Sequence, residues 1–222
     1  MSTSTIAVVR IPSSEFALSD TFEQCPEIEC DIERLVAQDS DSAMPFMWVR
    51  GPDLDAVEDA LREDSSVSEL EVLSDLSDER LYRMSWVAHI RLVIHILLEE
   101  EGTILDAYGR DGNWRLRIMF PERESLSATY DFCREQGLSF GVEKIYDMND
   151  SARAGRYGLS EEQFDALTTA AEQGYFEVPR GTSATELGEM LGITHQSLSE
   201  RLRRGQENLI RSTLLIDDPD VD

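Results

Sequence analysis

The hydrophobic pattern of this sequence changes once, near residue 150, and that change constrains the fold class. Before it, short runs that alternate apolar and polar residues, as strands do, are interleaved with runs of helical period. After it, the pattern stays helical to about residue 215. The segment Met148–Gly158 is polar and contains two glycines, which is typical of a linker. We therefore expect an α+β domain over residues 1–150 and an all-α domain over residues 157–216.

The first domain should contain eight strands and three helices in the order β-β-β-α-β-β-α-β-β-α-β. The clearest hairpin joins Thr103–Tyr108 to Trp114–Phe120 around the turn Gly109–Gly112. Such an order favours a sandwich with a mainly antiparallel sheet, with ferredoxin-like elements between about Pro45 and Tyr108. The other predicted strands are Ile6–Ile11, Ile28–Val36, Phe46–Val49, Leu70–Leu73, Arg80–Trp86 and Leu138–Tyr146, and the helices are Leu54–Arg62, Val87–Glu101 and Ser125–Gln136.

Two helix starts are marked in the second domain by capping boxes, Ser160–Gln163 and Ser183–Glu186. The helix that the first box opens should bury Phe164, Leu167 and Ala171 and end at Gly174. The helix that the second box opens is interrupted after about two turns by a glycine. This layout predicts one longer helix followed by a short one.

A third helix should follow the short one at a steep angle, as in a helix-turn-helix. Two short helices that cross steeply need a glycine in the tight turn and a small residue where they touch. Gly192 supplies the first and Gly188 the second. Thr194 can cap the third helix, and Leu198 and Leu202, four residues apart, share its buried face.

The polar residues of the third helix match the chemistry of DNA recognition. A glutamine can bridge an adenine edge, an arginine can bridge a guanine edge, and a serine can bond to a base or a phosphate. Arginines elsewhere on the helix can bind phosphates, which position the protein. The candidate base-reading residues are His195, Gln196, Ser199 and Arg203, and the candidate phosphate-binding residues are Thr194, Arg201, Arg204 and Arg211.

The charge of the chain bears on both its environment and its partner. The formal net charge is −25, and Lys144 is the only lysine. Such an acidic, lysine-poor surface favours a halophilic protein over an acidic mesophilic one, because molar salt shortens the Debye length to about 3 Å and screens the repulsion. Residues 156–216 hold six arginines and nine acidic residues, so they carry −3 and the remainder carries −22. Negative charge is thus kept away from the predicted DNA-binding region.

Four stretches of the second domain closely resemble the helix-turn-helix of the haloarchaeal bacterio-opsin activator family: Gly158–Phe164, Gly174–Arg180, Thr185–Ile193 and Ser199–Arg204. This core is also similar to the DNA-binding region of sigma factors, and the resemblance covers roughly residues 157–214. Residues 1–150 look like the α+β domain that precedes this motif in such proteins. The resemblance implies a transcription regulator whose partner is double-stranded promoter DNA.

Enzyme signatures are missing from the sequence. It has no P-loop, G-x-G-x-x-G, H-E-x-x-H or nucleophile elbow, and its histidines and cysteines are not spaced as metal ligands, so we expect no enzyme, cofactor or metal. No signal pattern is visible, and the longest apolar stretch, Trp86–Leu98, is short and carries charges. We therefore expect a cytoplasmic protein with no membrane partner.

Several alternatives remain open at this stage. The helical region could be an ordinary helical hairpin with arginines on a solvated face. The N-terminal domain could bind a homodimer partner or the transcription machinery, or it could bind a small effector and act as a sensor that controls DNA binding. A third possibility is an enzyme or scaffold with an incidental helical tail.

Overall fold

The computed structural model describes residues 4–37, 42–87, 91–147 and 157–213. It separates into two compact units, residues 1–147 (unit 1) and residues 148–222 (unit 2). Unit 1 combines a sheet with helices, and the helices of unit 2 follow it in the chain, so the predicted α+β class is confirmed. Most of the expected linker lies outside the described residues. None of the described helices is long and apolar enough to cross a membrane.

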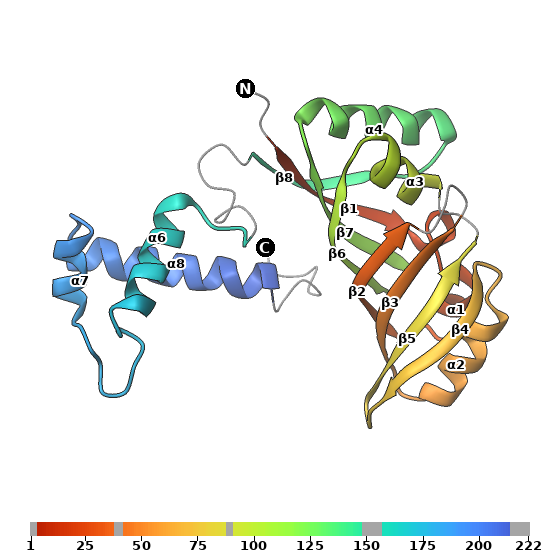
Figure 1. The fold of residues 1–222 in the computed structure, drawn as a ribbon, viewed down its shortest axis with the longest axis horizontal. Coiled ribbons are helices and arrows are strands. Elements are labelled where there is room, and N and C mark those ends of the chain that lie inside the picture. Colours follow the sequence, from red (N-terminus) through yellow and green to blue (C-terminus); the bar gives the residue numbers. More distant parts are fainter. Residues whose placement is uncertain (1–3, 38–41, 88–90, 148–156, 214–222) are drawn as a thin grey trace. The chain divides into compact units, whose positions relative to one another are not determined.

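Unit 1 is built on one eight-stranded antiparallel sheet with the order β4-β5-β3-β2-β6-β7-β1-β8 (Figure 1). The ferredoxin-like unit expected between Pro45 and Tyr108 would place β6 directly beside β3, but β2 lies between them. The strands are β1 (Thr5–Pro12), β2 (Glu29–Ala37), β3 (Ala43–Arg50), β4 (Val67–Asp75), β5 (Glu79–Trp86), β6 (Thr103–Arg110), β7 (Asn113–Phe120) and β8 (Gly141–Asp147).

The predicted hairpin is β6–β7, but its turn is shorter than expected. Arg110 pairs with Asn113, which leaves a two-residue turn at Asp111 and Gly112. Both turn residues have positive φ, 50° and 70°, which suits the twist of the strands they join. Alternation along β7 then places Trp114 and Leu116 on the buried side of the sheet.

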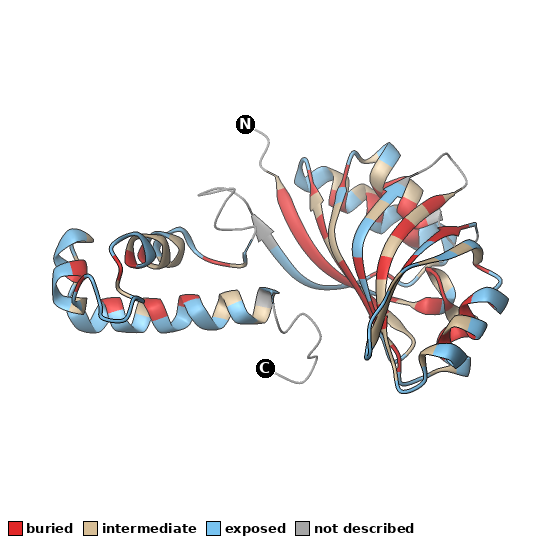
Figure 2. Ribbon diagram, turned by 60° about the horizontal axis from the view of Figure 1, so that its bottom comes forward, coloured by how far each residue is buried: buried red, intermediate tan, exposed pale blue. Residues whose placement is uncertain are grey.

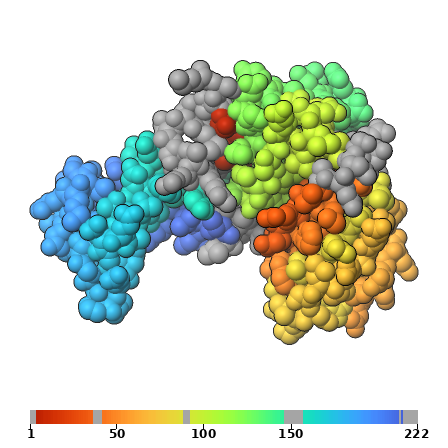
Figure 3. Space-filling model, in the orientation of Figure 1, coloured from red at the N-terminus to blue at the C-terminus, as the bar shows by residue number. Residues whose placement is uncertain are grey.

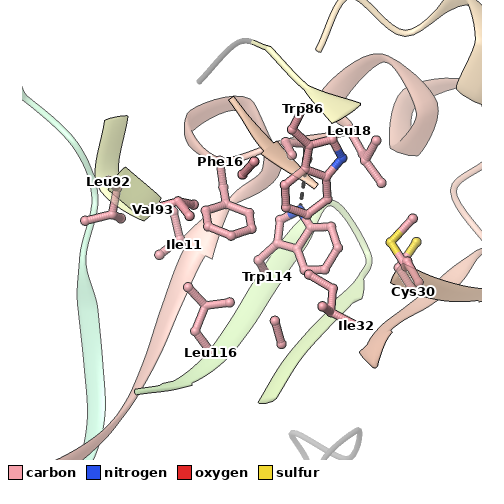
Figure 4. Packing of buried hydrophobic residues seen from close by; sticks show 14 of the residues in the cluster. Ile11, Phe16, Leu18, Cys30, Ile32, Trp86, Leu92, Val93, Trp114 and Leu116 are labelled. Atoms are coloured by element: carbon pink, nitrogen blue, oxygen red, sulfur yellow. Dashed lines mark hydrogen bonds between the residues drawn. The ribbon is translucent and has the colours of Figure 1, made fainter. Parts of the chain in front are cut away.

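The helices of unit 1 share one hydrophobic core with one face of the sheet. At its centre Phe16, Trp86 and Trp114 pack with ring centroids 5.4–5.6 Å apart (Figure 4). The indole N–H of Trp114 donates to the carbonyl of Ala17 at 2.9 Å. These helices are η1 (Ser13–Glu15), α1 (Ser19–Gln24), α2 (Leu54–Glu63), α3 (Arg91–Ile94), the π-helical turn η2 (His95–Glu99) and α4 (Arg123–Gln136).

Two of these helical segments differ from the prediction. Part of the helix expected over Val87–Glu101, residues 88–90, lies outside the described residues, Val87 is not helical, and the α-helix of Arg91–Ile94 changes to a π turn at His95. The short α1 was not predicted, because six residues are too few to show a helical period. Its place is fixed by distant residues, since the buried Asp64 carboxylate accepts bonds from the backbone N–H and hydroxyl of Thr21 at 2.8 and 2.7 Å.

The opposite face of the sheet carries charged side chains that pair between strands. Glu143 of β8 accepts one bond from Arg10 of β1 and another from Arg115 of β7, both at 2.9 Å. In Figure 3, the side chains of β4 and β5 lie on the viewer's side of unit 1 without a helix over them. On this face β7 places Arg115 and Arg117 between its core residues, whereas β3 places Phe46 and Trp48 there, half-buried.

Unit 2 contains α6 (Glu161–Glu172), α7 (Ala184–Met190) and α8 (His195–Thr213), with its own hydrophobic core. Both α6 and α7 pack against α8 (Figure 1). The face of α6 expected to be buried is wrong in detail, because Ala171 is exposed and Phe164 only half-buried. The core residues are Ala166, Ala170, Leu187, Leu198 and Leu202.

Candidate nucleic-acid interface

Both predicted capping boxes are present and fix where the helices of unit 2 begin. In α7, the Ser183 hydroxyl accepts from the backbone N–H of Glu186 at 3.2 Å, and the Glu186 carboxylate accepts from the Ser183 N–H at 2.8 Å. The bonds that the backbone N–H and the hydroxyl of Ser183 donate to the Glu186 carboxylate favour its ionised form and lower the pKa of Glu186. Ser160 and Gln163 form the same reciprocal pair at the start of α6.

The turn between α7 and α8 has the geometry expected of a helix-turn-helix. Gly192 has a φ of +67°, a left-handed conformation that side chains disfavour. Gly188 lies against the chain beyond the turn, and the N–H of Ile193 donates to its carbonyl at 2.9 Å. Thr194 then caps α8 by accepting from the N–H of Ser197 at 3.2 Å. The two glycines and the threonine therefore have the structural roles that the sequence predicted.

A second contact holds α8 against α6. A Cβ atom on Gly205 would lie 3.0 Å from Cδ1 of Leu167 and 3.3 Å from Cβ of Gln163, so the helices approach closely there. The Asn208 amide donates to the Gln163 side chain at 3.0 Å, while the same oxygen accepts from the N–H of Ser160 at 3.1 Å. Gln163, which completes the capping box of α6, thus also fixes the position of α8.

These contacts decide which side of α8 faces outward. Leu198 is fully buried and Leu202 is 4% exposed, and both belong to the core of unit 2. The buried positions follow one side of α8, and the other side is exposed (Figure 2). Gln196 and Arg203 are exposed and seven residues apart, so they share one face two turns apart. Neither makes a hydrogen bond or ion pair with another described residue.

The remaining candidate base-reading residues flank this pair. His195 and Ser199 are exposed and four residues apart, so they lie one above the other on a neighbouring face. All eight candidate residues therefore lie on α8 or at its N-cap, and their contacts to DNA stay predictions.

The candidate phosphate-binding arginines differ in their surroundings. Arg204 is exposed and pairs with Glu200, and Arg211 is half-buried and lies 3.3 Å from Glu207. Arg201 is half-buried. With four arginines and two glutamates, α8 carries a net positive charge in a strongly acidic chain.

The structure adds residues that sequence reasoning missed. Glu200 and Glu207 lie on the exposed side of α8, and their spacing of four from an arginine could have indicated the ion pairs. In the loop before α7, the Arg180 guanidinium lies 4.7 Å from the centre of the Tyr175 ring. Among the described residues, no three His, Cys, Asp or Glu side chains gather as metal ligands would.

Comparison with known proteins agrees with this geometry. Residues 159–211 match the family "HTH DNA binding domain", and residues 8–143 match the "GAF and HTH_10 associated domain". A "Putative transcriptional regulator" of Haloferax volcanii is 39% identical over 72 residues, 32% of this chain and 12% of that protein. "Transcriptional regulator NarO" of the same organism is 39% identical over 56 residues, 25% of this chain and 26% of the relative.

These matches differ in how much of each protein they cover. The two relatives are matched over only a minor part of their own length. The two family matches, by contrast, cover most of unit 1 and nearly all of the three helices described in unit 2. The match to the "GAF and HTH_10 associated domain" over residues 8–143 alone covers more than half of the chain. On this evidence, the chain belongs to the bacterio-opsin activator-like family of helix-turn-helix transcription regulators.

Proposed function

We propose that this chain regulates transcription in the cytoplasm of a halophilic archaeon by binding promoter DNA with α8 in the major groove. The observation that carries the proposal is the phase of α8. Its apolar residues Leu198 and Leu202 are buried in unit 2, while Gln196 and Arg203 point outward with no other partner among the described residues. The major groove of B-DNA is wide enough to admit a helix presented in this way.

The chemistry of each outward residue sets its proposed role. Arg203 can donate two bonds to the O6 and N7 atoms of guanine, and Gln196 can bridge N6 and N7 of adenine. His195 and Ser199 would contact neighbouring base edges. The phosphate contacts would come from residues on the flanks of the helix, namely Thr194, Arg201, Arg204 and Arg211.

The test is binding of the purified full-length chain to a pool of duplexes from a haloarchaeal genome in molar KCl. Arg203→Ala and Gln196→Ala should each lower affinity for the selected sites by about 1–3 kcal/mol and relax preference at one base pair. Arg211→Ala should instead weaken binding to all sequences alike. The matched control is Arg134→Ala, which removes an exposed arginine from unit 1 that pairs with Asp131 at 2.9 Å.

Unchanged DNA binding by both Arg203→Ala and Gln196→Ala, with unchanged melting curves, would assign α8 to protein interaction instead. The alternative in which unit 1 senses a small effector is not favoured, because the family match that bears on function, over residues 159–211, is to a DNA-binding domain. For unit 1 the proposed role is binding to a second copy of the chain or to a component of the transcription machinery. Sedimentation of the purified chain with and without selected DNA tests the dimer.

A further inference from the structure

A glutamate lies on the outward side of α8, between the two candidate base-reading residues Gln196 and Arg203. Glu200 follows the buried Leu198 by two residues and precedes the buried Leu202 by two, so its side chain points away from the core of unit 2. It also lies one turn after Gln196 and almost one turn before Arg203, on the same face. A helix that enters the major groove at Gln196 and Arg203 therefore carries a carboxylate between them.

A carboxylate in this place needs a physical explanation, because DNA phosphates repel it. Part of the explanation is Arg204, which donates a hydrogen bond to the Glu200 carboxylate from the next turn. The two side chains are 54% and 63% exposed, so the pair lies at the surface. An arginine has five N–H donors, which allows Arg204 to hold Glu200 and still contact a phosphate.

Salt supplies the rest of the explanation. In molar salt the long-range repulsion between Glu200 and the phosphates is largely screened. Phosphate contacts also contribute less affinity there, since counterion release weakens with rising salt concentration. Hydrogen bonds to base edges act at short range, so a larger share of the discrimination between sequences falls to them.

A carboxylate can only accept hydrogen bonds, and this restricts the base it can face. In the major groove, guanine presents two acceptors, and thymine presents an acceptor and a methyl group. Adenine presents its N6 donor directly beside the N7 acceptor, which repels a carboxylate. Cytosine presents the N4 amino donor, which Asp and Glu accept from in the known pairings. We propose, on the basis of the proposed function, that Glu200 is a specificity-determining residue that selects cytosine, with Arg204 as its positioning residue.

The other glutamate of α8 serves as an internal comparison. Glu207 also pairs with an arginine four residues later, Arg211. It lies eleven residues beyond Gln196, about 16 Å along the helix axis. Recognition helices contact base edges mainly with their N-terminal residues. Glu207 should therefore influence DNA binding through its charge alone, without contacting a base.

The experiment selects bound duplexes from a randomised pool in molar KCl, using the full-length chain and four variants, and sequences them. The parent should enrich cytosine at one position, and Glu200→Ala should reduce that preference by about tenfold, the effect of one base contact. Glu200→Gln should shift the preference toward adenine, whose N6 and N7 atoms an amide can bridge. Arg204→Ala should weaken the cytosine preference at this same position, and Glu207→Gln should leave it intact.

The outcomes separate this inference from the proposed function. If the parent selects a sequence and both Glu200 variants select the same one, the inference is wrong and the regulator remains. The inference is also wrong if Glu200→Gln and Glu207→Gln only increase binding to all sequences alike. Failure of the parent to bind any duplex, with its fold verified by circular dichroism, overturns both.

Discussion

A Cβ atom on Gly188 would lie 2.8 Å from the carbonyl oxygen of Ile193, closer than real side chains approach a backbone oxygen. The N–H of Ile193 in turn donates to the carbonyl of Gly188 at 2.9 Å. The short helix α7 and the turn that precedes α8 therefore touch backbone to backbone. This contact sets the direction in which α8 leaves the turn, and so the outward direction of Gln196 and Arg203.

Replacing Gly188 with alanine should destabilise unit 2. In an ordinary helix interior, alanine in place of glycine stabilises by roughly 0.5–1 kcal/mol. Here the new methyl group would meet a backbone oxygen that cannot move without opening the turn, so we expect a loss of about 1–3 kcal/mol instead. Thermal unfolding of the Gly188→Ala variant in molar KCl measures the sign directly.

Gly192→Asn is the matched control for the same turn. Its φ of +67° is left-handed, but no other atom lies within 4 Å of a Cβ placed there. Asparagine tolerates this conformation better than other side chains, so Gly192→Asn should cost less than Gly188→Ala. A stabilised Gly188→Ala variant would show that α7 and the turn before α8 do not touch as described.

The sequence predicted unit 2 better than unit 1, for a physical reason. Capping boxes, a turn glycine and apolar spacing are local signals, and all of them lie within short stretches of the chain. The inward direction of Leu198 followed from the same local spacing. The face of α6 was missed because it depends on how closely Gly205 lets α8 approach, which is a tertiary property.

In unit 1 the strands were predicted and their order was not. Each strand has its own alternation, as in β7, and that pattern is visible in the sequence. Which strands pair depends on contacts between distant segments, such as Cys30 of β2 beside Val49 of β3 and Gly109 of β6. Because several registers can satisfy the same alternation, β2 could not be placed between β3 and β6 from the sequence.

Leu198→Ala should destabilise unit 2 and reduce DNA binding only indirectly. Leu198 is fully buried among the residues of the unit 2 core, so truncation leaves a cavity that costs roughly 2–5 kcal/mol. Ile210→Ala, on the same helix but 44% exposed, is the control and should cost much less. Denaturant unfolding measures both. If DNA binding by Leu198→Ala does not recover on cooling, Leu198 has a more direct role.

Acid should weaken the start of α7. The hydrogen bonds from Ser183 place the pKa of Glu186 below its ordinary value of 4.5 in the folded chain. A carboxyl whose pKa is lowered by folding stabilises the fold above its unfolded pKa, and this contribution is lost as pH falls through the folded pKa. The melting temperature of the parent should exceed that of Glu186→Gln at neutral pH, and the difference should shrink below about pH 4.5.

Glu189→Gln is the control for this experiment, because it removes a charge from the same helix without touching Ser183. A constant difference between the parent and Glu186→Gln down to low pH would contradict the role of the ionised capping box.

The two units should fold as separate domains with the boundaries predicted from the sequence. Each unit has its own hydrophobic core, and no residue is shared between the two clusters. A fragment of residues 1–150 should keep the circular dichroism of a sheet protein, and a fragment of residues 157–216 should be helical. The smaller fragment buries less surface and should melt at a lower temperature. Loss of structure in both fragments would indicate that the chain folds as one domain.

Folding should require high salt, because the charge of −25 must be screened. At about 0.1 M salt the Debye length is roughly 10 Å, so neighbouring carboxylates on the surface repel one another, and at about 1 M it falls to roughly 3 Å. Circular dichroism across this range should therefore show unfolding at the low end.

A variant with fewer surface carboxylates should keep its structure to lower salt. Suitable exposed positions for amide substitution are Glu23, Glu27, Asp59 and Glu135. If the parent keeps its full native spectrum at low salt, or if the four substitutions leave the salt midpoint unchanged, then self-repulsion does not limit stability. In that case the acidic surface would need an explanation other than adaptation to salt.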